Sequence, residues 1–355
     1  MKKPKKILIV DFGGIGDLVL SIPFLRGIKT AFPSSKVSIL CADNRGMILK
    51  EQPYVARIFL SPITLLGILK TGLQLRKKRF DMAINLMPET SNFSALKMYF
   101  LFLLINAKQW VGRDTEGRGF FYDIKVPEPK MQMENEVLIY GRILKTISNS
   151  DFDEKLEFHC SKKSRTRAGE LLSKERNFQK DPLVLINPGS DWLSRRWPVA
   201  RYAKLAKRLL ASFSSVEFGV IGTPAERMLA DFLKEAVGDR VFILSGKTPL
   251  EILPAVMEKV CLVISNDSGP AHIARAVGTQ VVVLAGPSAP AFLSIRGRNK
   301  SVVLQHPVSC SPCLKVSCDT MDCLNVLSVD EVLAVTSQML RNVIEADSQG
   351  RRQVN

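Results

Sequence analysis

Short runs of apolar residues recur along the chain, and a turn of small or polar residues follows most of them. A run of about four to eight apolar residues between turn signals is typical of a strand buried on both faces of a parallel sheet. In the first half of the chain such runs lie at residues 6–12, 36–42, 56–60, 81–86 and 109–112. In the second half they lie at residues 183–186, 216–221, 241–244, 260–264 and 280–285. The pattern predicts two successive α/β units, each with a parallel sheet.

Several segments between these strands have the periodicity of amphipathic helices. In residues 18–31 one helical face carries Leu18, Val19, Ile22, Leu25 and Ile28. Further helices are predicted at residues 63–79, 91–105, 161–176, 199–210 and 328–340. The last of them opens with a capping box, because Ser328 stands three residues before Glu331.

A polar stretch near the middle of the chain separates the two predicted units. We expect a first domain at residues 1–160, a linker and hinge at 161–182, a second domain at 183–345 that ends with a helix, and a disordered tail at 346–355. The length of 355 residues supports two domains, because single cores stop growing beyond about 250–300 residues.

Composition narrows the class of partner. The net charge of +16 suits a phosphate-rich partner such as a nucleic acid, an anionic membrane or a phosphorylated glycolipid. Aromatic residues make up only 7% and do not interleave with basic ones, which argues against a nucleic-acid partner. Residues 7–12 are too short for a signal core, and the longest apolar run, residues 98–105, is too short to span a bilayer. With seven cysteines and no export signal, we expect a reduced, cytoplasmic protein.

A glycine turn follows the first strand. Gly13, Gly14 and Gly16 lead to Asp17, but Val19 stands where a dinucleotide fingerprint would have its third glycine. The turn is therefore a poor nicotinamide site. Asp17 is either a helix cap or a carboxylate held at the sheet edge as a general base.

A second turn, at residues 265–272, has the features of a phosphate site. Ser268 and Gly269 can point backbone N–H groups outward, and the helix that follows adds its positive end. Asp267 and His272 bracket this turn with an acceptor and a donor. The alternative is an ordinary loop in which Asp267 caps the helix.

Two other features leave alternatives open. Residues 63–79 and 91–105 combine basic and apolar side chains, so they form either a membrane-facing surface or a solvated charge run beside a buried helix. Cys310, Cys313, Cys318 and Cys323 have a spacing that could hold zinc or an iron–sulfur cluster, or they remain thiols or form a local disulfide.

The chain resembles glycosyltransferase family 9, the ADP-heptose:lipopolysaccharide heptosyltransferases, in motifs that occur in the same order. They are GGIGD at residues 13–17 with SIP at 21–23, NPGS at 187–190 with RWP at 196–198, and DSGPAH at 267–272. The resemblance covers residues 5–340. It implies the GT-B fold, with two Rossmann-like domains and a cleft between them. By this resemblance the first domain, residues 1–160, would bind the acceptor and the second, residues 183–345, the nucleotide sugar.

The resemblance also implies an activity. That activity is inverting, metal-independent transfer of heptose from ADP-L-glycero-D-manno-heptose to the inner core of a lipopolysaccharide precursor on lipid A, without a cofactor. The enzyme would act at the cytoplasmic face of the bacterial inner membrane, peripherally bound to its anionic surface. Transfer of another sugar from another nucleotide to a cell-surface glycan is the alternative.

Site residues follow from the resemblance by position. Asp17 corresponds to the proposed base, Ser190 and Arg195 to diphosphate-binding positions, and Glu226 to the ribose-binding residue. Arg195 stands where the family commonly has lysine. The turn that contains Thr248 would flank the adenine. The donor loop corresponds to Asp267, Ser268, Gly269, Pro270 and His272.

Overall fold

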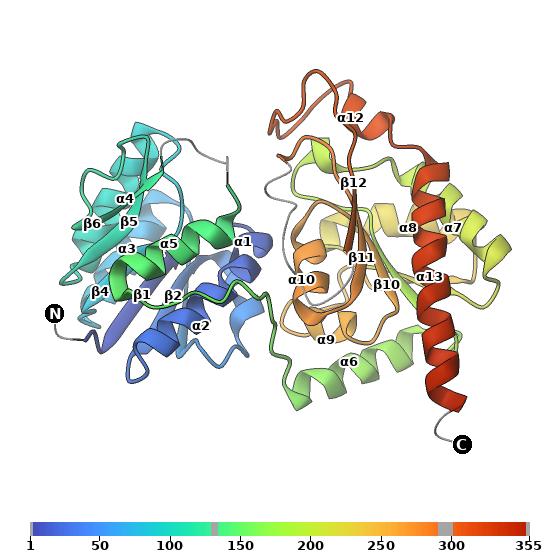
Figure 1. The fold of residues 1–355 in the computed structure, drawn as a ribbon, viewed down its shortest axis with the longest axis horizontal. Helices are drawn as coiled ribbons and strands as arrows, with labels where there is room; N and C mark the ends of the chain where they lie inside the picture. Colours follow the sequence, from blue (N-terminus) through green and yellow to red (C-terminus); the bar gives the residue numbers. More distant parts are fainter. Residues whose placement is uncertain (1–2, 129–133, 290–300, 353–355) are drawn as a thin grey trace. The chain divides into compact units, whose positions relative to one another are not determined.

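The computed structural model describes residues 3–128, 134–289 and 301–352, with side chains described as far as Glu345. The chain divides into two compact units, of which the first runs to His159 and the second begins at Cys160 (Figure 1). Each unit has its own six-stranded sheet, and every pair of neighbouring strands is parallel.

The two sheets have the same strand order. The first sheet consists of β1 (Lys6–Asp11), β2 (Lys36–Ala42), β3 (Arg57–Ser61), β4 (Met82–Asn85), β5 (Trp110–Thr115) and β6 (Ile124–Glu128). The second consists of β7 (Leu183–Asn187), β8 (Glu217–Val220), β9 (Val241–Ile243), β10 (Leu262–Asn266), β11 (Gln280–Leu284) and β12 (Ser301–Leu304). The orders β3-β2-β1-β4-β5-β6 and β9-β8-β7-β10-β11-β12 are both the Rossmann order, which confirms the predicted α/β class.

This order matters for function because it reverses once in each sheet. The reversal lies between β1 and β4 in the first unit and between β7 and β10 in the second. Open α/β sheets bind ligands at the carboxyl ends of the strands that flank such a switch point. The turns after these four strands are therefore the places to look for a site.

Helices connect the strands of each unit. In the first unit they are α1 (Ile15–Leu20), α2 (Ile22–Ala31), α3 (Leu65–Arg76), α4 (Asn92–Ile105) and α5 (Glu136–Ser148), with the short 3-10 helix η1 (Asp43–Leu49). In the second unit they are α6 (Lys162–Glu175), α7 (Val199–Ser212), α8 (Arg227–Val237), α9 (Leu253–Met257), α10 (Gly269–Val277), α12 (Asp322–Asn325) and α13 (Val329–Arg352), with η2 (Leu193–Arg195) and η3 (Pro224–Glu226). The stretch predicted as a linker and hinge contains α6, which lies within the second unit.

Two helix predictions were wrong in extent. The single helix expected over residues 18–31 begins earlier, at Ile15, and breaks at Ser21, because Pro23 lacks an N–H and its ring disfavours an uninterrupted helix. The last helix was expected to end at Leu340 and to be followed by a disordered tail from residue 346. It continues to Arg352, since the intervening residues include good helix formers such as Glu345.

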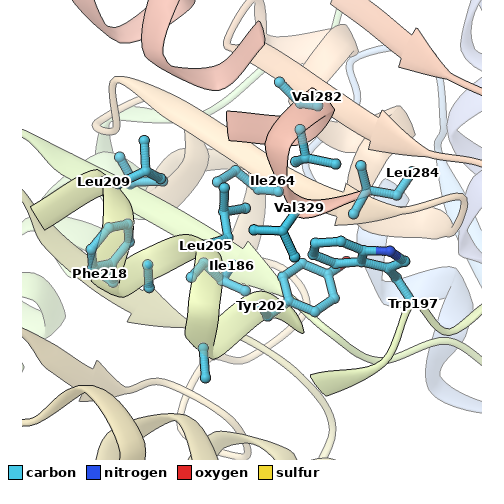
Figure 2. Close-up of a cluster of buried hydrophobic side chains, with 14 of the residues drawn as sticks. Ile186, Trp197, Tyr202, Leu205, Leu209, Phe218, Ile264, Val282, Leu284 and Val329 are labelled. Atoms are coloured by element: carbon cyan, nitrogen blue, oxygen red, sulfur yellow. The ribbon is translucent and has the colours of Figure 1, made fainter. Parts of the chain in front are cut away.

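The core of the second unit holds the start of α7 in place. The Trp197 ring lies edge-on to Tyr202 with centroids 4.9 Å apart, and both side chains are fully buried (Figure 2). The indole N–H of Trp197 donates to the Leu327 carbonyl at 3.1 Å, and the Tyr202 hydroxyl donates to Asn266 Oδ1 at 2.8 Å. Burying a side chain of this size contributes about 1.5–3 kcal/mol to stability. The hydrogen bond from Tyr202 therefore ties Asn266, the last residue of β10, to a rigid core.

Candidate functional site

Two asparagines join the turns at the switch point of the second sheet. Asn187 ends β7, and its Nδ2 donates to Ser265 Oγ at 3.0 Å and to Ser268 Oγ at 2.9 Å. Asn266 ends β10, and its Nδ2 donates to the Pro188 carbonyl at 2.8 Å. Each strand thus ends in a side chain that fixes the other strand's turn. Sequence reasoning gave neither asparagine a role, although each stands within two residues of the end of an apolar run.

Asp267 lies at the centre of this edge and is not a helix cap. Its Oδ2 accepts a hydrogen bond from Ser288 Oγ and lies 3.6 Å from Arg195 Nη1. The Arg195 guanidinium carbon is 4.0 Å from the centroid of the Trp192 ring, so the arginine is stacked as well as paired. Ser268 occupies the N-cap position of α10, which rules out the sequence-based alternative that Asp267 caps the helix.

The amino end of α10 is free to bind an anion. Within the described part of the chain, Ser268 makes no side-chain capping bond to the first turn, which contains Gly269 and Pro270. The amide groups of such a turn and the helix dipole together favour negative charge. This end of α10 therefore has the features that a phosphate requires.

Two polar nitrogens beside this turn are buried without a hydrogen-bond partner among the described residues. They are Arg195 Nε and His272 Nδ1. Burial lowers the pKa of His272 to about 4, against the opposing effect of Asp267, so the imidazole is neutral at pH 7. Buried groups of this kind normally have a hydrogen-bond partner, so both nitrogens are candidates for contact with a ligand.

Glu226 packs against the turn that follows β7. Its Oε2 accepts from the Thr223 N–H at 2.8 Å, and its Oε1 lies 3.7 Å from Arg196 Nη2. A Cβ on Gly189 would lie 2.0 Å from Glu226 Oε1, so only glycine fits there with Glu226 in this position. Arg196 also donates to the Ser190 carbonyl from Nε at 2.9 Å and from Nη2 at 2.7 Å. Sequence reasoning did not single out Arg196, which links the predicted residues Ser190 and Glu226.

Thr248 lies one turn further along the same edge. The Gly246 N–H donates to the Gly222 carbonyl at 3.0 Å, which joins the turn after β9 to the turn after β8. Thr248 Oγ1 donates to the Leu244 carbonyl at 3.3 Å. The structure therefore places all the predicted donor-site residues at one edge of one sheet, on the turns after β10, β7, β8 and β9.

Asp17 lies at the switch point of the first sheet, after β1. It is the third residue of α1, and its Oδ2 accepts from the Gly14 N–H at 2.7 Å. A Cβ on Gly13 would lie 2.6 Å from that oxygen, so the turn closes tightly against the carboxylate. Gly16 lies within α1 beside it. Asp17 caps the helix and is also half-buried at the sheet edge, so the two sequence interpretations are compatible.

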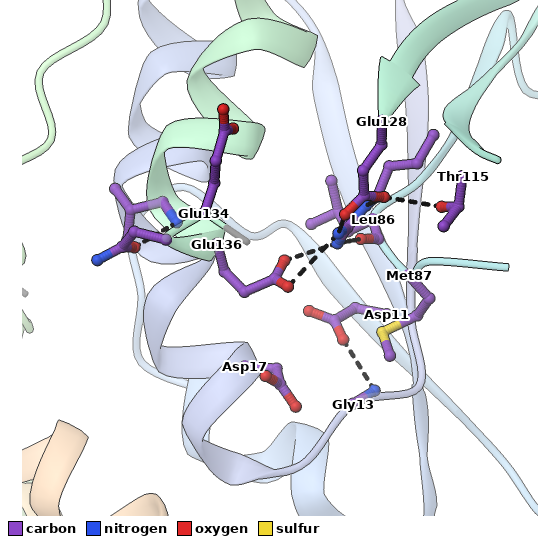
Figure 3. A network of polar contacts seen from close by, with 12 residues as sticks. Asp11, Gly13, Asp17, Leu86, Met87, Thr115, Glu128, Glu134 and Glu136 are labelled. Carbon is purple, nitrogen blue, oxygen red and sulfur yellow. Dashed lines mark hydrogen bonds and ion pairs between the residues drawn. The ribbon is translucent and has the colours of Figure 1, made fainter. Parts of the chain in front are cut away.

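A second aspartate lies under this turn and was not predicted. Asp11, the last residue of β1, is fully buried, and its Oδ1 accepts from the Gly13 N–H at 2.9 Å (Figure 3). Burial, followed by the charge of Asp17, raises the pKa of Asp11 to about 7.

A buried charge network adjoins the two aspartates. Arg113 Nε donates to Glu128 Oε2 at 2.8 Å, and Arg113 Nη1 donates to Glu136 Oε2 at 2.6 Å and to the Leu86 carbonyl at 3.0 Å (Figure 3). Burial raises the pKa of Glu136, although Arg113 opposes the shift. No sequence motif marks this network, because its members come from β5, β6 and α5 and meet only in the fold.

The four cysteines do not form a metal centre in this structure. Cys310 is exposed and Cys323 is buried, and the described residues contain no group of three or more histidine, cysteine or acidic side chains gathered around one point. Burial and the other three thiols raise the pKa of Cys323. These four cysteines are free thiols, so the local disulfide is also not formed.

The cysteine-rich segment instead supports the turns of the site. The Cys313 N–H donates to the Pro287 carbonyl at 3.2 Å, and Ser311 Oγ donates to the Gly286 carbonyl at 3.1 Å. The Ser194 N–H donates to the Val316 carbonyl at 3.2 Å. The segment thus contacts both the turn that carries Arg195 and the turn after β11.

Comparison with protein families gives one match. The sequence model of glycosyltransferase family 9 (heptosyltransferase) matches residues 68–323. That range includes the predicted donor-site residues and omits the turn that carries Asp17.

Individual relatives and solved structures agree with that match. The chain is 27% identical to the lipopolysaccharide core heptosyltransferase OpsX of Haemophilus influenzae over 290 residues, which is 79% of each protein. A family 9 glycosyltransferase from Veillonella parvula has a similar fold, with a TM-score of 0.77, 21% identity and coverage of 96% of this chain and 99% of that one. The ADP-heptose lps heptosyltransferase II of E. coli superposes with a TM-score of 0.74 at 20% identity, covering 97% of this chain and 99% of that one.

Proposed function

The chain belongs to glycosyltransferase family 9 and is a glycosyltransferase, and from that premise we propose that it transfers heptose from ADP-L-glycero-D-manno-heptose to the inner core of a lipopolysaccharide precursor. Relatives that are lipopolysaccharide heptosyltransferases support the choice of sugar and acceptor. The observation that carries the proposal is the pairing of Arg195 with Asp267 beside the uncapped amino end of α10.

The donor diphosphate binds beside the positively charged groups at the amino end of α10. The first-turn N–H groups of α10 and the Arg195 guanidinium face the same turn, and Arg195 Nε has no other partner among the described residues. An arginine can hold a diphosphate through two parallel hydrogen bonds, which a lysine cannot do. Asp267 orients the guanidinium, and the neutral His272 supplies an uncharged donor or acceptor beside it.

The nucleoside extends along the adjacent turns. Glu226 accepts hydrogen bonds from the ribose hydroxyls, for which its Oε1 is turned toward Gly189. The turn that contains Thr248 flanks the base. A carboxylate paired with hydroxyl groups gives a preference for ribose, since hydrogen bonds to charged groups are worth about 1.5–3 kcal/mol.

The reaction is a single displacement at the anomeric carbon. The acceptor oxygen forms a bond to that carbon, the bond from the carbon to the phosphate oxygen breaks, and its electron pair leaves with ADP. Asp17 takes the proton of the acceptor hydroxyl, which is worth a factor of about 10²–10⁴ in rate. Arg195 and the amides of α10 stabilise the negative charge on the leaving ADP, so the step requires no metal. Because the transfer is a single displacement, it inverts the configuration at the anomeric carbon.

An exposed apolar surface on α3 and α4 supports binding at an anionic membrane. The large apolar side chains exposed there are Ile63, Leu65, Leu66, Leu69, Leu73, Phe93, Leu96, Phe100 and Leu103. Exposed basic residues on or beside the same helices are Lys70, Arg76, Lys77, Arg79 and Lys97. We call this set the α3–α4 surface. Apolar side chains with surrounding positive charge suit the headgroup region of an anionic bilayer, where a lipid-linked acceptor lies.

Buried and exposed side chains alternate along α4. Leu101, Phe102 and Ile105 are buried, as a core helix requires, whereas Phe100 and Leu103 of the same turns are exposed. No helix in the described ranges is long and apolar enough to cross a membrane. We propose that the protein binds peripherally at the cytoplasmic face of the inner membrane, through the α3–α4 surface.

A product assay tests the proposal. The purified protein is incubated with ADP-heptose and lipopolysaccharide acceptors truncated after successive core sugars, and the products are identified by mass spectrometry. We expect one heptose to be added to one acceptor with release of ADP and inversion at the anomeric carbon, unaffected by EDTA. Transfer from a UDP- or GDP-sugar, and none from ADP-heptose, would contradict the proposed donor.

A further inference from the structure

Two aspartates hold one short turn at the carboxyl end of β1. Asp11 Oδ1 accepts the N–H of Gly13 at 2.9 Å, and Asp17 Oδ2 accepts the N–H of Gly14 at 2.7 Å. A Cβ on Gly13 would lie 2.6 Å from Asp17 Oδ2. Because the two carboxyl groups hold consecutive amides of one tight turn, their relative position is fixed by the backbone.

The second oxygen of Asp11 is in an unusual environment. Asp11 is fully buried, and its Oδ2 has no hydrogen-bond partner among the residues that the structure describes. An ionised oxygen in such a place destabilises a fold, whereas a proton on Oδ2 removes the charge. A buried polar atom left in this state calls for a functional explanation.

The charges around Asp11 favour a retained proton. The titratable groups that act on Asp11, or on which it acts, come from four elements: Asp17 of α1, Glu136 and Tyr140 of α5, Arg113 of β5, and Cys41 of β2. Burial, Asp17 and Glu136 raise the pKa of Asp11, while the Gly13 N–H and Arg113 lower it, with a result of about 7. Arg113 is already paired with two glutamates, so its effect on Asp11 is the weakest of these.

We propose that Asp11 and Asp17 form a coupled carboxyl pair, in which Asp11 is a positioning residue that sets the proton affinity of the base Asp17. The inference rests on the proposed function, because it assumes that Asp17 accepts the proton of the acceptor hydroxyl. Asp11 itself does not touch the substrates.

The coupling acts through charge. While Asp11 holds its proton, Asp17 is ionised next to a neutral group. When Asp11 ionises, the second negative charge on the turn increases the affinity of Asp17 for the acceptor proton, since two adjacent carboxylates repel each other. The transferred proton then passes from Asp17 to solvent as ADP leaves, and Asp11 returns to its own equilibrium. A stronger base speeds the transfer, so the rate rises as Asp11 loses its proton.

Asp11→Asn separates this role from a structural one. The asparagine Oδ1 still accepts the Gly13 N–H, but the side chain is neutral at every pH, like protonated Asp11. With both substrates saturating, we expect the ratio of wild-type to variant kcat to be close to one below about pH 6 and about three- to tenfold above about pH 8. The wild-type profile should show the corresponding rise near pH 7, and the variant should lack it.

Asp81→Asn is the matched control. Asp81 precedes β4 at the opposite edge of the same sheet, where its Oδ1 pairs with Lys108 and its Oδ2 accepts the Lys5 and Lys6 N–H groups. Its loss should leave the shape of the pH profile unchanged. A wild-type to Asp11→Asn ratio that is constant across the pH range would assign Asp11 a structural role and overturn the proposal.

A titration without substrates tests the pair independently of activity. Carboxyl ¹³C chemical shifts of aspartate-labelled protein are followed against pH in the wild type and in Asp17→Asn. We expect Asp11 to titrate near pH 7 in the wild type and at lower pH in the variant, because the like charge is removed. An unchanged midpoint would overturn the coupling. Absence of heptose transfer by the wild type would instead refute the proposed function, and this titration would still decide on the pair.

Discussion

At the scale of single residues, the site depends on side chains that hold neighbouring turns rather than on any one motif. Asn187 and Asn266 tie the turns after β7 and β10 together, and Arg196 ties Ser190 to Glu226. These bonds fix the backbone that would contact the diphosphate. Two other atoms beside these turns, Arg195 Nε and His272 Nδ1, are buried without a hydrogen-bond partner in the described chain, and we propose that they face the ligand.

Arg195 is expected to supply much of the affinity for the diphosphate. Arg195→Ala should weaken ADP binding by about 10- to 100-fold, because hydrogen bonds to a charged group are lost. Arg195→Lys should be milder, since a point charge still faces the phosphates. Isothermal calorimetry measures both, with Arg208→Ala, an exposed arginine paired with Asp330, as the control. Wild-type affinity in Arg195→Ala would remove Arg195 from the site.

Glu226 is expected to recognise the ribose. Wild-type protein should bind ADP about tenfold or more tightly than 2′,3′-dideoxy-ADP, because the analogue leaves the carboxylate without its hydroxyl partners. Glu226→Ala should bind the two nucleotides equally. Equal discrimination by the wild type and the variant would mean that the ribose is held by other groups.

The buried Asp11 should make stability depend on pH. Its pKa is about 7 in the folded protein against an ordinary value of 3.8, so the folded state binds more protons between these values. The free energy of unfolding therefore falls as pH rises through this window, by about 4 kcal/mol at most. Asp11→Asn does not lose unfolding free energy in this way. The Tm of the variant minus the Tm of the wild type should therefore increase from pH 5 to pH 8. A Tm difference that does not vary with pH would contradict the buried titration.

At the scale of elements, the proposed donor-site residues and the proposed base lie at the carboxyl ends of the strands. The proposed membrane contact lies on two helices. α3 and α4 pack closely, since a Cβ on Gly72 would lie 2.6 Å from Leu104 Cβ. Their outward faces nevertheless keep large apolar side chains in contact with solvent, among them Leu65 and Leu66, which are 82% and 75% exposed. So many exposed large apolar side chains on two adjacent helices are unusual for a surface that stays in water.

The α3–α4 surface is expected to bind anionic bilayers. Leu65→Glu combined with Leu66→Glu should reduce co-sedimentation with phosphatidylglycerol vesicles, and added salt should weaken wild-type binding because each basic residue contributes about 1 kcal/mol near the surface. Both leucines are exposed, so the fold should tolerate the change. Met228→Glu on α8, where the side chain is 81% exposed, is the matched control. Binding that is indifferent to anionic lipid, or equal loss in the control, would contradict a membrane role for this surface.

At the scale of the whole molecule, sequence patterns predicted all the central strands but only two of the four edge strands, β3 and β9. Central strands such as β1 and β10 are continuous apolar runs, which only a doubly covered sheet explains. The edge strands β6 and β12 were missed, because the first contains Pro127 and charged residues and the second is short.

The same division holds for the site. Turns were predictable because each lies within a few residues of its strand. Pairings such as Asn187 with Ser268, 81 residues apart, and Arg113 with Glu136, 23 residues apart, depend on strand order and were not predictable from local pattern. In the sequence, Asp11 is only a polar residue at the end of an apolar run. Only the fold shows that it holds the same turn as Asp17.

The most direct test of the account is the turnover of Asp17→Asn with ADP-heptose and the lipopolysaccharide acceptor. Asparagine keeps an oxygen for the Gly14 N–H, so folding and ADP affinity should remain those of the wild type. Without a base, kcat should fall by about 10²-fold or more. Asp81→Asn, measured in parallel, should retain full turnover. A kcat of Asp17→Asn within a few-fold of the wild type would contradict the account and leave Asp17 a helix cap.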